Sequence, residues 1–367
     1  MKGIIDYTVK YGQKSLEELP FNEVDSLVLS QLSYLKFNHV IPYDTDVILS
    51  KIQQSKYVEE IFSDKRYEKP NRELFSSLIN SIRYKNVLIR DFFDISDPVT
   101  NLQFSAMSFV FHDDLAYIAF RGTDDTITGW HEDFNMIYNS PVPSQIHAVS
   151  YLNNFASKYE GKMIVGGHSK GGNLAVYAFA KCDDSYKDRI KRIYSHDGPG
   201  FIEGVLTDAE KAAVDKKLRK TVPKASIVGM LMQTEPGYEV VDCKSYGLKQ
   251  HDPFNWRVNG SRFKRYHDLH KHSTLQSESI NEWVRQMSLS DRRDFVEAVF
   301  EAFDRAGITN LNEINSEPSR CLQRLSSAVD DMSTEKRDMV YTFMRQLFKM
   351  RFDKSIDNVK SSLEHFR

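Results

Sequence analysis

The spacing of hydrophobic positions changes twice along the chain. Up to about residue 85 the apolar residues repeat at a helical period, and a second helix is predicted over residues 72–83. Asn22, two residues after Pro20, is placed to cap the first helix. The apolar positions of that helix are Val24, Leu27, Val28, Leu32 and Leu35. We therefore expect residues 1–85 to form an N-terminal helical region.

The spacing in residues 86–275 is that of strands. NVLIRDFF, LQFSAMSFVF and LAYIAF are separated by short turn-like stretches, which favours antiparallel pairing at the start of a sheet. Helices then alternate with strands, and one of them is VLTDAEKAAVDKKLRK, where Thr207 and Glu210 have capping-box spacing. This alternation predicts an α/β core with a mainly parallel sheet and helices on its faces. The later strands are predicted at KMIVG, RIYS, SIVGMLM and YEVVDC.

Residues 276–367 return to a helical period and are predicted to form a C-terminal helical region. Gly307 is placed to end a helix after Phe303. Because the helices have one apolar face, they should pack on the core or on a partner chain, so a homo-oligomer through these helices is one expectation. The apolar residues recur as Ile280, Trp283, Val284 and Met287, and as Val340, Phe343, Met344 and Leu347.

Composition places the chain among ordinary globular proteins, with 367 residues, 41% hydrophobic, 27% charged and a formal net charge of −2. This charge balance implies no general attraction to nucleic acid or to an acidic membrane. Cys182, Cys243 and Cys321 are far apart, which argues against a disulfide framework or a zinc site and fits a reducing compartment. The sequence shows no signal peptide and no apolar run of about 20 residues. We therefore expect a cytoplasmic protein without a transmembrane segment.

MIVGGHSKGGNLAVYAFA, residues 163–180, places one serine between two pairs of glycines. Gly167-His168-Ser169-Lys170-Gly171 fits G-x-S-x-G, in which a nucleophilic serine occupies a sharp turn from a strand to a helix. The residues two before and two after the serine crowd each other there, so both must lack side chains. The stretch predicts Ser169 as a nucleophile and Gly167 and Gly171 as the glycines of its elbow. A glycine-rich turn without chemistry is the alternative.

A tetrahedral intermediate at such a serine needs two hydrogen-bond donors. One would be the backbone N–H of Lys170, the residue after the nucleophile. LAYIAFRGTDDT offers the other, because the strand ends at Phe120 and Thr123 then has a backbone N–H and a hydroxyl to donate. The same stretch also fits an ordinary turn at a strand end.

Two stretches together resemble a known family pattern. AFRGTDDTITGWHEDF followed by GGHSKGGNLA resembles lipase class 3, in which F-R-G-[ST] and a D-W-x-x-D-like stretch precede G-H-S-x-G-G. Gly129-Trp130 departs from that pattern, where an acidic residue often precedes the tryptophan. The sequence more closely resembles the Mbeg-like family of uncharacterised bacterial α/β-hydrolase-like proteins, through PFNEVDSLVLSQLSYL, the elbow, SHDGPGF and QHDPFNW. The resemblance implies an α/β-hydrolase-like fold and hydrolase machinery more than a particular substrate.

A nucleophilic Ser169 requires a histidine to accept its proton, and α/β-hydrolases order these residues as Ser, acid, His. His251 follows the last predicted strand and lies in the matched QHDPFNW segment, so it is the predicted base. A histidine that only caps a turn is the alternative. Asp197, before a Gly-Pro-Gly turn, is the preferred acid. Glu235, beyond SIVGMLM, is the alternative acid and is closer to the usual lipase class 3 placement.

The remaining histidines are interpreted as structural or solvated. His168 is next to Ser169 and is expected to pack against its neighbours. His267, His270 and His272 lie among basic residues, and no nearby cysteine or paired carboxylates complete a metal ligand set. No metal and no organic cofactor are predicted.

Together these residues predict a serine hydrolase, esterase- or lipase-like, that cleaves a small-molecule or lipid ester and has no nucleic-acid partner. A peptidase, an amidase or an acyltransferase would use the same triad and the same acyl-enzyme, and these alternatives stay open. A non-catalytic scaffold on a hydrolase fold is the alternative from another class of function. The flanking helical regions are candidates for a lid or wall over the site.

Overall fold

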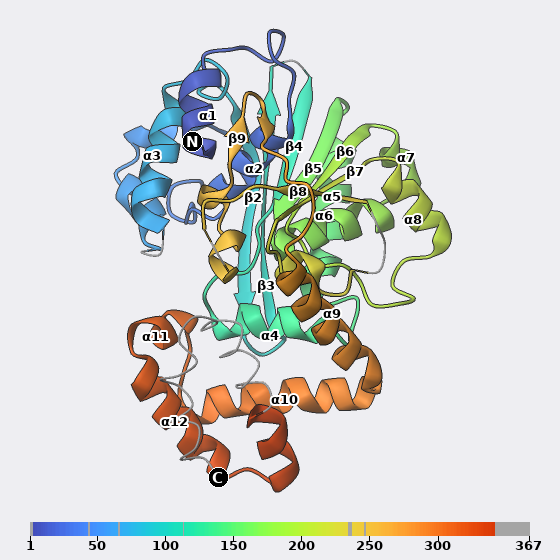
Figure 1. Ribbon diagram of the computed structural model, residues 1–367. Coiled ribbons are helices and arrows are strands. Elements are labelled where there is room, and N and C mark those ends of the chain that lie inside the picture. The colour runs from blue at the N-terminus through green and yellow to red at the C-terminus, as the bar shows by residue number, and fades with distance from the viewer. Residues whose placement is uncertain are drawn as a thin grey trace.

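The chain is built around an eight-stranded sheet whose strands lie in sequence order from β1 to β8 (Figure 1). The computed structural model describes residues 3–42, 45–64, 67–112, 114–233, 237–245 and 247–341. β2 to β4 pair antiparallel and β4 to β8 pair parallel, as the spacing of the strands predicted. β1 also pairs antiparallel with β2, although it lies in the region that was predicted to be helical. The strands are β1 (Val47–Ile48), β2 (Leu88–Asp97), β3 (Leu102–Phe111), β4 (Leu115–Phe120), β5 (Lys162–His168), β6 (Ile190–His196), β7 (Leu218–Pro223) and β8 (Tyr238–Val241).

Helices cover both faces of this sheet. Figure 1 shows α1–α3 on one side of the strands and α5–α8 on the other. The apolar side chains of α1–α3 share one core with the sheet, and those of α5 and α6 share a second core with the opposite face. A mainly parallel sheet enclosed in this way confirms the predicted α/β-hydrolase-like fold. The helices are α1 (Ile4–Tyr11), α2 (Glu23–Leu32), α3 (Glu68–Ile79), α4 (Ile127–Asn135), α5 (Pro143–Lys158), α6 (Lys170–Lys181), α7 (Asp184–Lys187) and α8 (Asp208–Asp215).

Several helix ends follow local signals in the sequence. Asn22 Oδ1 accepts a hydrogen bond from the Val24 N–H at 2.9 Å, so α2 begins where the capping pattern predicted. Thr207 Oγ1 accepts one from the Glu210 N–H at 3.3 Å and caps α8. α3 was predicted over residues 72–83 but begins at Glu68 and ends at Ile79.

One predicted strand is wrong. The segment 226–232 forms no strand, and its middle is the 3-10 helix Val228–Met230. β7 comes earlier, at Leu218–Pro223, partly within residues that the periodicity assigned to the preceding helix. The local reason is Gly229, whose N–H donates to Asp197 Oδ1 at 3.2 Å and where a Cβ would lie 2.2 Å from that oxygen. This apolar run therefore folds around a buried carboxylate and does not pair with a strand.

The helices after the sheet build a third core. α10 (Leu289–Arg305), α11 (Leu311–Ser316) and α12 (Pro318–Asp330) pack on one another, and α10 also packs on α4. α9 (Lys271–Gln286) precedes them, and its Asn281 side chain donates to the Met230 carbonyl of the core. α10 is followed by Gly307 at φ +60°, which confirms the predicted stop. Val340 is buried in this core, whereas Phe343, Met344 and Leu347 lie outside the described residues. The division of the chain at residues 85 and 275 stays a prediction.

A short hairpin of β9 (Val258–Asn259) and β10 (Arg262–Phe263) follows β8. The chain after it adds to the edge of the sheet, because the Tyr266 N–H donates to the Val240 carbonyl at 2.9 Å. Within the described part of the chain, we find no helix long and apolar enough to cross a bilayer.

Candidate active site

Ser169 occupies a strained turn between β5 and α6. Its backbone angles are φ +58° and ψ −134°, a conformation that costs a residue with a Cβ on the order of 1–3 kcal/mol. β5 ends at His168 and α6 begins at Lys170, so the serine alone makes the change of direction. Ser169 is 9% exposed. Sterically costly backbone at a nearly buried serine is typical of a nucleophile held toward a substrate.

The two glycines of the G-x-S-x-G stretch have separate steric causes. A Cβ on Gly167 would lie 2.2 Å from the carbonyl carbon of Gly171, and one on Gly171 would lie 2.0 Å from the Phe120 oxygen. Gly172 lets α6 approach the next strand, because its Cβ would lie 2.7 Å from Ser195 Oγ. No side chain fits at these positions, as the elbow interpretation requires.

The structure brings the predicted base and the preferred acid together. His251 Nδ1 and Asp197 Oδ2 are 2.6 Å apart. The other oxygen, Asp197 Oδ1, accepts hydrogen bonds from Ser226 Oγ at 2.5 Å and from the Gly229 N–H at 3.2 Å. Asp197 is 1% exposed, so its carboxylate is held by three donors in a buried place. This pairing orients the imidazole and leaves Nε2 as the ring nitrogen that can accept a proton.

The structure records no hydrogen bond between Ser169 Oγ and His251 in the described chain. His168, the residue before Ser169, nevertheless lies against His251, because the centroids of their rings are 4.5 Å apart. Hydrogen bonds between a nucleophile and its base are often long in ligand-free sites and tighten with substrate. The alternative acid, Glu235, lies outside the described residues.

The loop after β4 reaches the nucleophile. A Cβ placed on Gly122 would lie 3.0 Å from Ser169 Cβ, so the backbone that leads into Thr123 passes directly beside the serine. The Thr123 hydroxyl donates to the Asp133 carboxylate. Burial raises the pKa of Asp133 to about 6. With its hydroxyl engaged in this way, Thr123 has its backbone N–H to offer to an oxyanion.

Lys170, the other predicted oxyanion donor, also has a buried side chain. Its Nζ donates to Glu132 Oε2 at 2.8 Å and to the Gln103 carbonyl at 2.8 Å. Glu132 is fully buried and its Oε1 accepts the Ser144 N–H at 2.7 Å. A buried ion pair thus fixes the residue that follows the nucleophile to β3 and α4. Glu132 was not predicted from the sequence, although WHEDF places it beside Asp133.

Two further histidines lie in the same region and are buried. His168 Nε2 is 2.7 Å from the His251 carbonyl oxygen, and His196 contacts Thr221 Oγ1 at 2.8 Å and Ser26 Oγ at 2.9 Å. Burial lowers the pKa of His196 to about 3. Ser26 belongs to α2, and so the N-terminal helices contribute polar groups to this end of the sheet, which the sequence did not predict.

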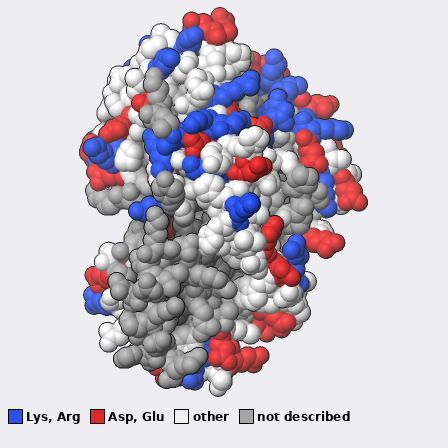
Figure 2. All heavy atoms as spheres, in the orientation of Figure 1, with Lys and Arg blue, Asp and Glu red and all other residues white. Residues whose placement is uncertain are grey.

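The basic segment after β8 lies at the surface. His267 is fully exposed. Figure 2 shows Lys and Arg side chains gathered on the half of the molecule that carries the sheet, with acidic side chains among them. In the described part of the chain no three His, Cys, Asp or Glu side chains are arranged to hold a metal ion.

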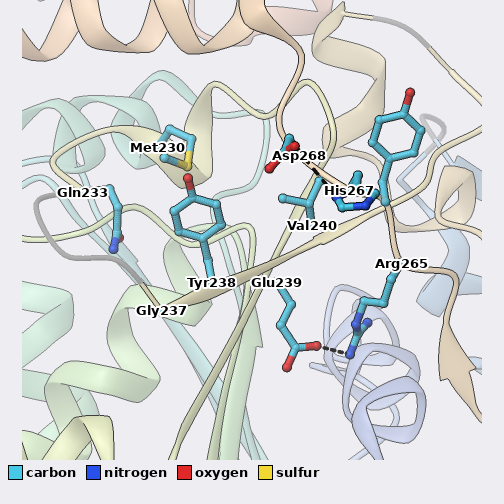
Figure 3. Close-up of a pocket in the computed structure, with 10 residues that line it drawn as sticks. Met230, Gln233, Gly237, Tyr238, Glu239, Val240, Arg265, His267 and Asp268 are labelled. Carbon is cyan, nitrogen blue, oxygen red and sulfur yellow. Dashed lines mark ion pairs between the residues drawn. The ribbon is translucent and has the colours of Figure 1, made fainter.

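A pocket of about 680 Å³ lies at the edge of the sheet beside β8. Figure 3 shows Glu239 from β8 and Arg265 from the next segment pointing toward each other, with an ion pair between them, and Tyr238 pointing toward Met230. Neither Ser169 nor His251 lines this pocket. It is therefore separate from the candidate site.

Comparisons with known proteins give a family and several distant structural similarities. A lipase from Rhizomucor miehei is 18% identical, with a TM-score of 0.31, and the alignment covers 43% of this chain and 57% of that one. The Lip2 lipase from Yarrowia lipolytica is 12% identical, with a TM-score of 0.36, covering 56% of this chain and 78% of that one. A lipase from Rhizopus microsporus var. chinensis is 17% identical, with a TM-score of 0.34, and the alignment covers 70% of this chain and 92% of that one.

We base no conclusion on structural similarity at this level. This chain spans little more than half of the Rhizomucor miehei lipase, at 57% of its length. A comparison with curated proteins gives no significant match. The sequence profile of the Mbeg1-like family, in contrast, matches residues 78–301, which include the elbow and the His251 loop. The protein is therefore a member of the Mbeg1-like family, as the sequence resemblance predicted.

Proposed function

We propose that the protein is a serine hydrolase that cleaves a carboxylic ester through an acyl-enzyme on Ser169. The observation that supports this most is the strained backbone of Ser169 beside a hydrogen-bonded His251–Asp197 pair. A buried carboxylate that orients an imidazole is the arrangement by which a serine hydroxyl is activated.

In the first half of the reaction, Ser169 Oγ attacks the carbonyl carbon of the ester while His251 Nε2 takes the hydroxyl proton. The carbonyl oxygen becomes an oxyanion, and the backbone N–H groups of Lys170 and Thr123 stabilise it. The tetrahedral intermediate then collapses, the bond to the leaving alkoxy group breaks, and His251 protonates that oxygen. An alcohol leaves, and the acyl group stays on Ser169.

In the second half a water molecule attacks the acyl-enzyme, with His251 as the base. The carboxylic acid leaves, and the proton returns to Ser169 Oγ. Asp197 stabilises the imidazolium in both halves, because its carboxylate is 2.6 Å from Nδ1. Protein groups and water supply every proton that these steps require.

Turnover of p-nitrophenyl esters, from acetate to palmitate, tests this proposal. We expect the wild-type protein to hydrolyse members of the series, and Ser169→Ala and His251→Ala each to lower kcat by about a thousandfold or more. His267→Ala is the matched control, because that imidazole is fully exposed, and it should stay within about twofold of wild type. Absence of turnover by the wild-type protein, or full turnover by Ser169→Ala, would contradict the proposal.

A second pair of variants distinguishes the two acids. Asp197→Asn keeps the size of the side chain but removes the charge that faces His251 Nδ1, so we expect a loss of kcat of about a hundredfold to a thousandfold. Glu235→Gln should change kcat by less than about threefold. A larger loss of kcat in Glu235→Gln than in Asp197→Asn would assign the acid to Glu235.

The same kinetics separate the related reactions, because the acyl-enzyme is common to all of them. Hydrolysis of p-nitroanilides at a rate comparable with the esters would favour an amidase or peptidase. Transfer of the acyl group to an added alcohol in preference to water would favour an acyltransferase. A scaffold without catalysis would give no Ser169-dependent turnover with either class.

A further inference from the structure

The residue before the nucleophile is joined to a tyrosine of the N-terminal region and to the loop of the base. We propose that Tyr34 and His168 are positioning residues, which hold His251 in place through its backbone. This inference rests on the proposed function, because it concerns the base of that reaction. Three segments far apart in the sequence meet here, at residues 34, 168 and 251.

His168 donates its ring N–H to the loop that carries His251. The distance from His168 Nε2 to the His251 carbonyl oxygen is 2.7 Å. A carbonyl oxygen only accepts, so Nε2 must carry the proton. His168 is 4% exposed, so water does not readily replace this contact. The ring of the residue next to the nucleophile therefore fixes the backbone of the base.

Tyr34 contacts the other nitrogen of the same ring. Its hydroxyl lies 3.2 Å from His168 Nδ1 and 3.3 Å from the His168 carbonyl oxygen. With the proton on Nε2, Nδ1 of the neutral ring is an acceptor, and the tyrosine hydroxyl is placed to donate to it. With the proton on Nδ1, the lone pair of Nε2 would face the lone pairs of the His251 carbonyl, so that carbonyl selects the donating form of His168. Tyr34 holds the same ring at Nδ1 and at its backbone carbonyl and so keeps it in position.

A second ring holds the preceding carbonyl of the same loop. Trp256 is fully buried, and its Nε1–H donates to the Gln250 carbonyl at 2.9 Å. Two consecutive peptide carbonyls, at residues 250 and 251, thus each accept a hydrogen bond from an aromatic ring. With Asp197 holding Nδ1 of the side chain, both the backbone and the imidazole of His251 are fixed. Such support is what keeps a base within the narrow range of positions that catalysis needs.

Tyr34 is also close to the oxyanion loop. A Cβ on Gly122 would lie 2.1 Å from the Tyr34 hydroxyl and 3.0 Å from Ser169 Cβ, so the tyrosine and the serine flank the same glycine. The N-terminal region therefore forms one wall of the site and supplies the group that orders its second histidine.

The test combines the rate of Ser169 labelling by a fluorophosphonate with 15N NMR of the histidine rings. Tyr34→Phe removes the hydroxyl only, and Tyr57→Phe is the matched control, an exposed tyrosine in the same region. His168→Leu removes the ring donor, whereas His168→Gln retains an amide N–H that can reach the His251 carbonyl. Thermal unfolding by circular dichroism identifies any variant that has lost its fold.

In the wild-type protein we expect His168 to carry its proton on Nε2 and His251 to carry its proton on Nδ1. Tyr34→Phe should keep the proton of His168 on Nε2, because the His251 carbonyl still requires it, and should slow labelling by about threefold to tenfold, the effect of one lost hydrogen bond. His168→Leu should slow labelling by about tenfold to a hundredfold, and His168→Gln should recover most of the rate. Tyr57→Phe should label as wild type does.

Other results would overturn the inference. An Nδ1-protonated His168 in the wild-type protein would contradict the hydrogen bond to the His251 carbonyl. Equal labelling of Tyr34→Phe and Tyr57→Phe, or of His168→Gln and His168→Leu, would show that these groups do not position the base. If the wild-type protein is not labelled at all, the proposed function fails, and the tautomers of His168 in wild type and in Tyr34→Phe decide the structural part of the inference by themselves.

Discussion

The helices before the sheet and the helices after it contact the α/β core in different ways. Those before it share the core of one face of the sheet, and their polar side chains reach the buried histidines, as Ser26 does with His196 and Tyr34 with His168. Of those after it, α10, α11 and α12 pack mainly on one another and on α4. The His131 ring of α4 stacks on Phe300 of α10, with the ring centroids 4.2 Å apart.

The two regions also differ in how their charges are paired. In the N-terminal region Asp25 and Arg83 form an ion pair with both side chains fully buried, and Tyr7 and Tyr84 donate to the same carboxylate. In the C-terminal region the Arg320–Glu317 pair lies at the surface, with side chains 71% and 55% exposed. Changes in the first region should therefore affect the whole fold and the site, whereas changes in the second should act locally.

The largest expected difference comes from breaking these ion pairs. Arg83→Leu leaves the Asp25 carboxylate buried without its cation, and we expect the free energy of unfolding to fall by about 3–5 kcal/mol. Arg320→Leu, the matched change in the C-terminal helices, should leave it almost unchanged, because that pair lies at the surface. Urea unfolding followed by circular dichroism measures both. Equal losses would remove the distinction between the two regions.

The second-largest effect should come from acidification, which weakens the contact between His196 of the sheet and Ser26 of the N-terminal region. Burial lowers the pKa of His196 to about 3, whereas an unfolded histidine titrates near 6.5. The unfolded state therefore binds the extra proton first, so the stabilisation is complete above about pH 6.5 and is lost as the pH falls toward 3. Between pH 6.5 and pH 5 this group should reduce the free energy of unfolding by about 2 kcal/mol.

His196→Gln isolates that contribution, because glutamine does not titrate. The variant should show a shallower loss of stability between pH 6.5 and pH 5 than the wild-type protein. His267→Gln, in which the replaced ring is fully exposed, should keep the wild-type slope. A slope in His196→Gln that matches wild type would mean that His196 is not the group responsible.

A smaller and local effect is expected at the contact between α9 and residues 230–232, which follow β7. Asn281 Nδ2 donates to the Met230 carbonyl at 2.7 Å, and its Oδ1 accepts the Met232 N–H at 2.8 Å. Asn281→Ala removes both bonds and should cost about 1–2 kcal/mol of local stability. Hydrogen exchange at residues 228–232 should become about fivefold to thirtyfold faster. Gln286→Ala on the same helix is the control, and equal exchange in the two variants would contradict a local role for Asn281.

The sequence predicted those parts of the molecule whose causes are local. The G-x-S-x-G pattern lies within two positions of Ser169, and the caps at Asn22 and Thr207 depend on the next turn of helix. The α/β-hydrolase-like fold follows from the alternation of strands and helices. His251 and Asp197 were chosen by their order in the chain, and the structure brings them within hydrogen-bonding distance.

The features that the sequence did not predict depend on contacts between distant segments. SIVGMLM has the composition of a strand, but Gly229 is needed beside the Asp197 carboxylate, and the strand moves to residues 218–223. Tyr34 lies in the stretch PFNEVDSLVLSQLSYL, outside residues 78–301 that the family profile matches, and nothing in that stretch indicates a partner at His168. The Lys170–Glu132 ion pair likewise joins two helices through a hydrogen bond that no periodicity reveals.

The central claim, that Ser169 is a nucleophile activated by the groups around it, is tested most directly by the site of covalent modification. The wild-type protein is treated with a fluorophosphonate, digested and examined by tandem mass spectrometry. We predict one phosphonyl group per chain, located on Ser169, and none at that position in Ser169→Ala. A wild-type protein that stays unmodified, or that carries the group on another residue, would contradict the claim.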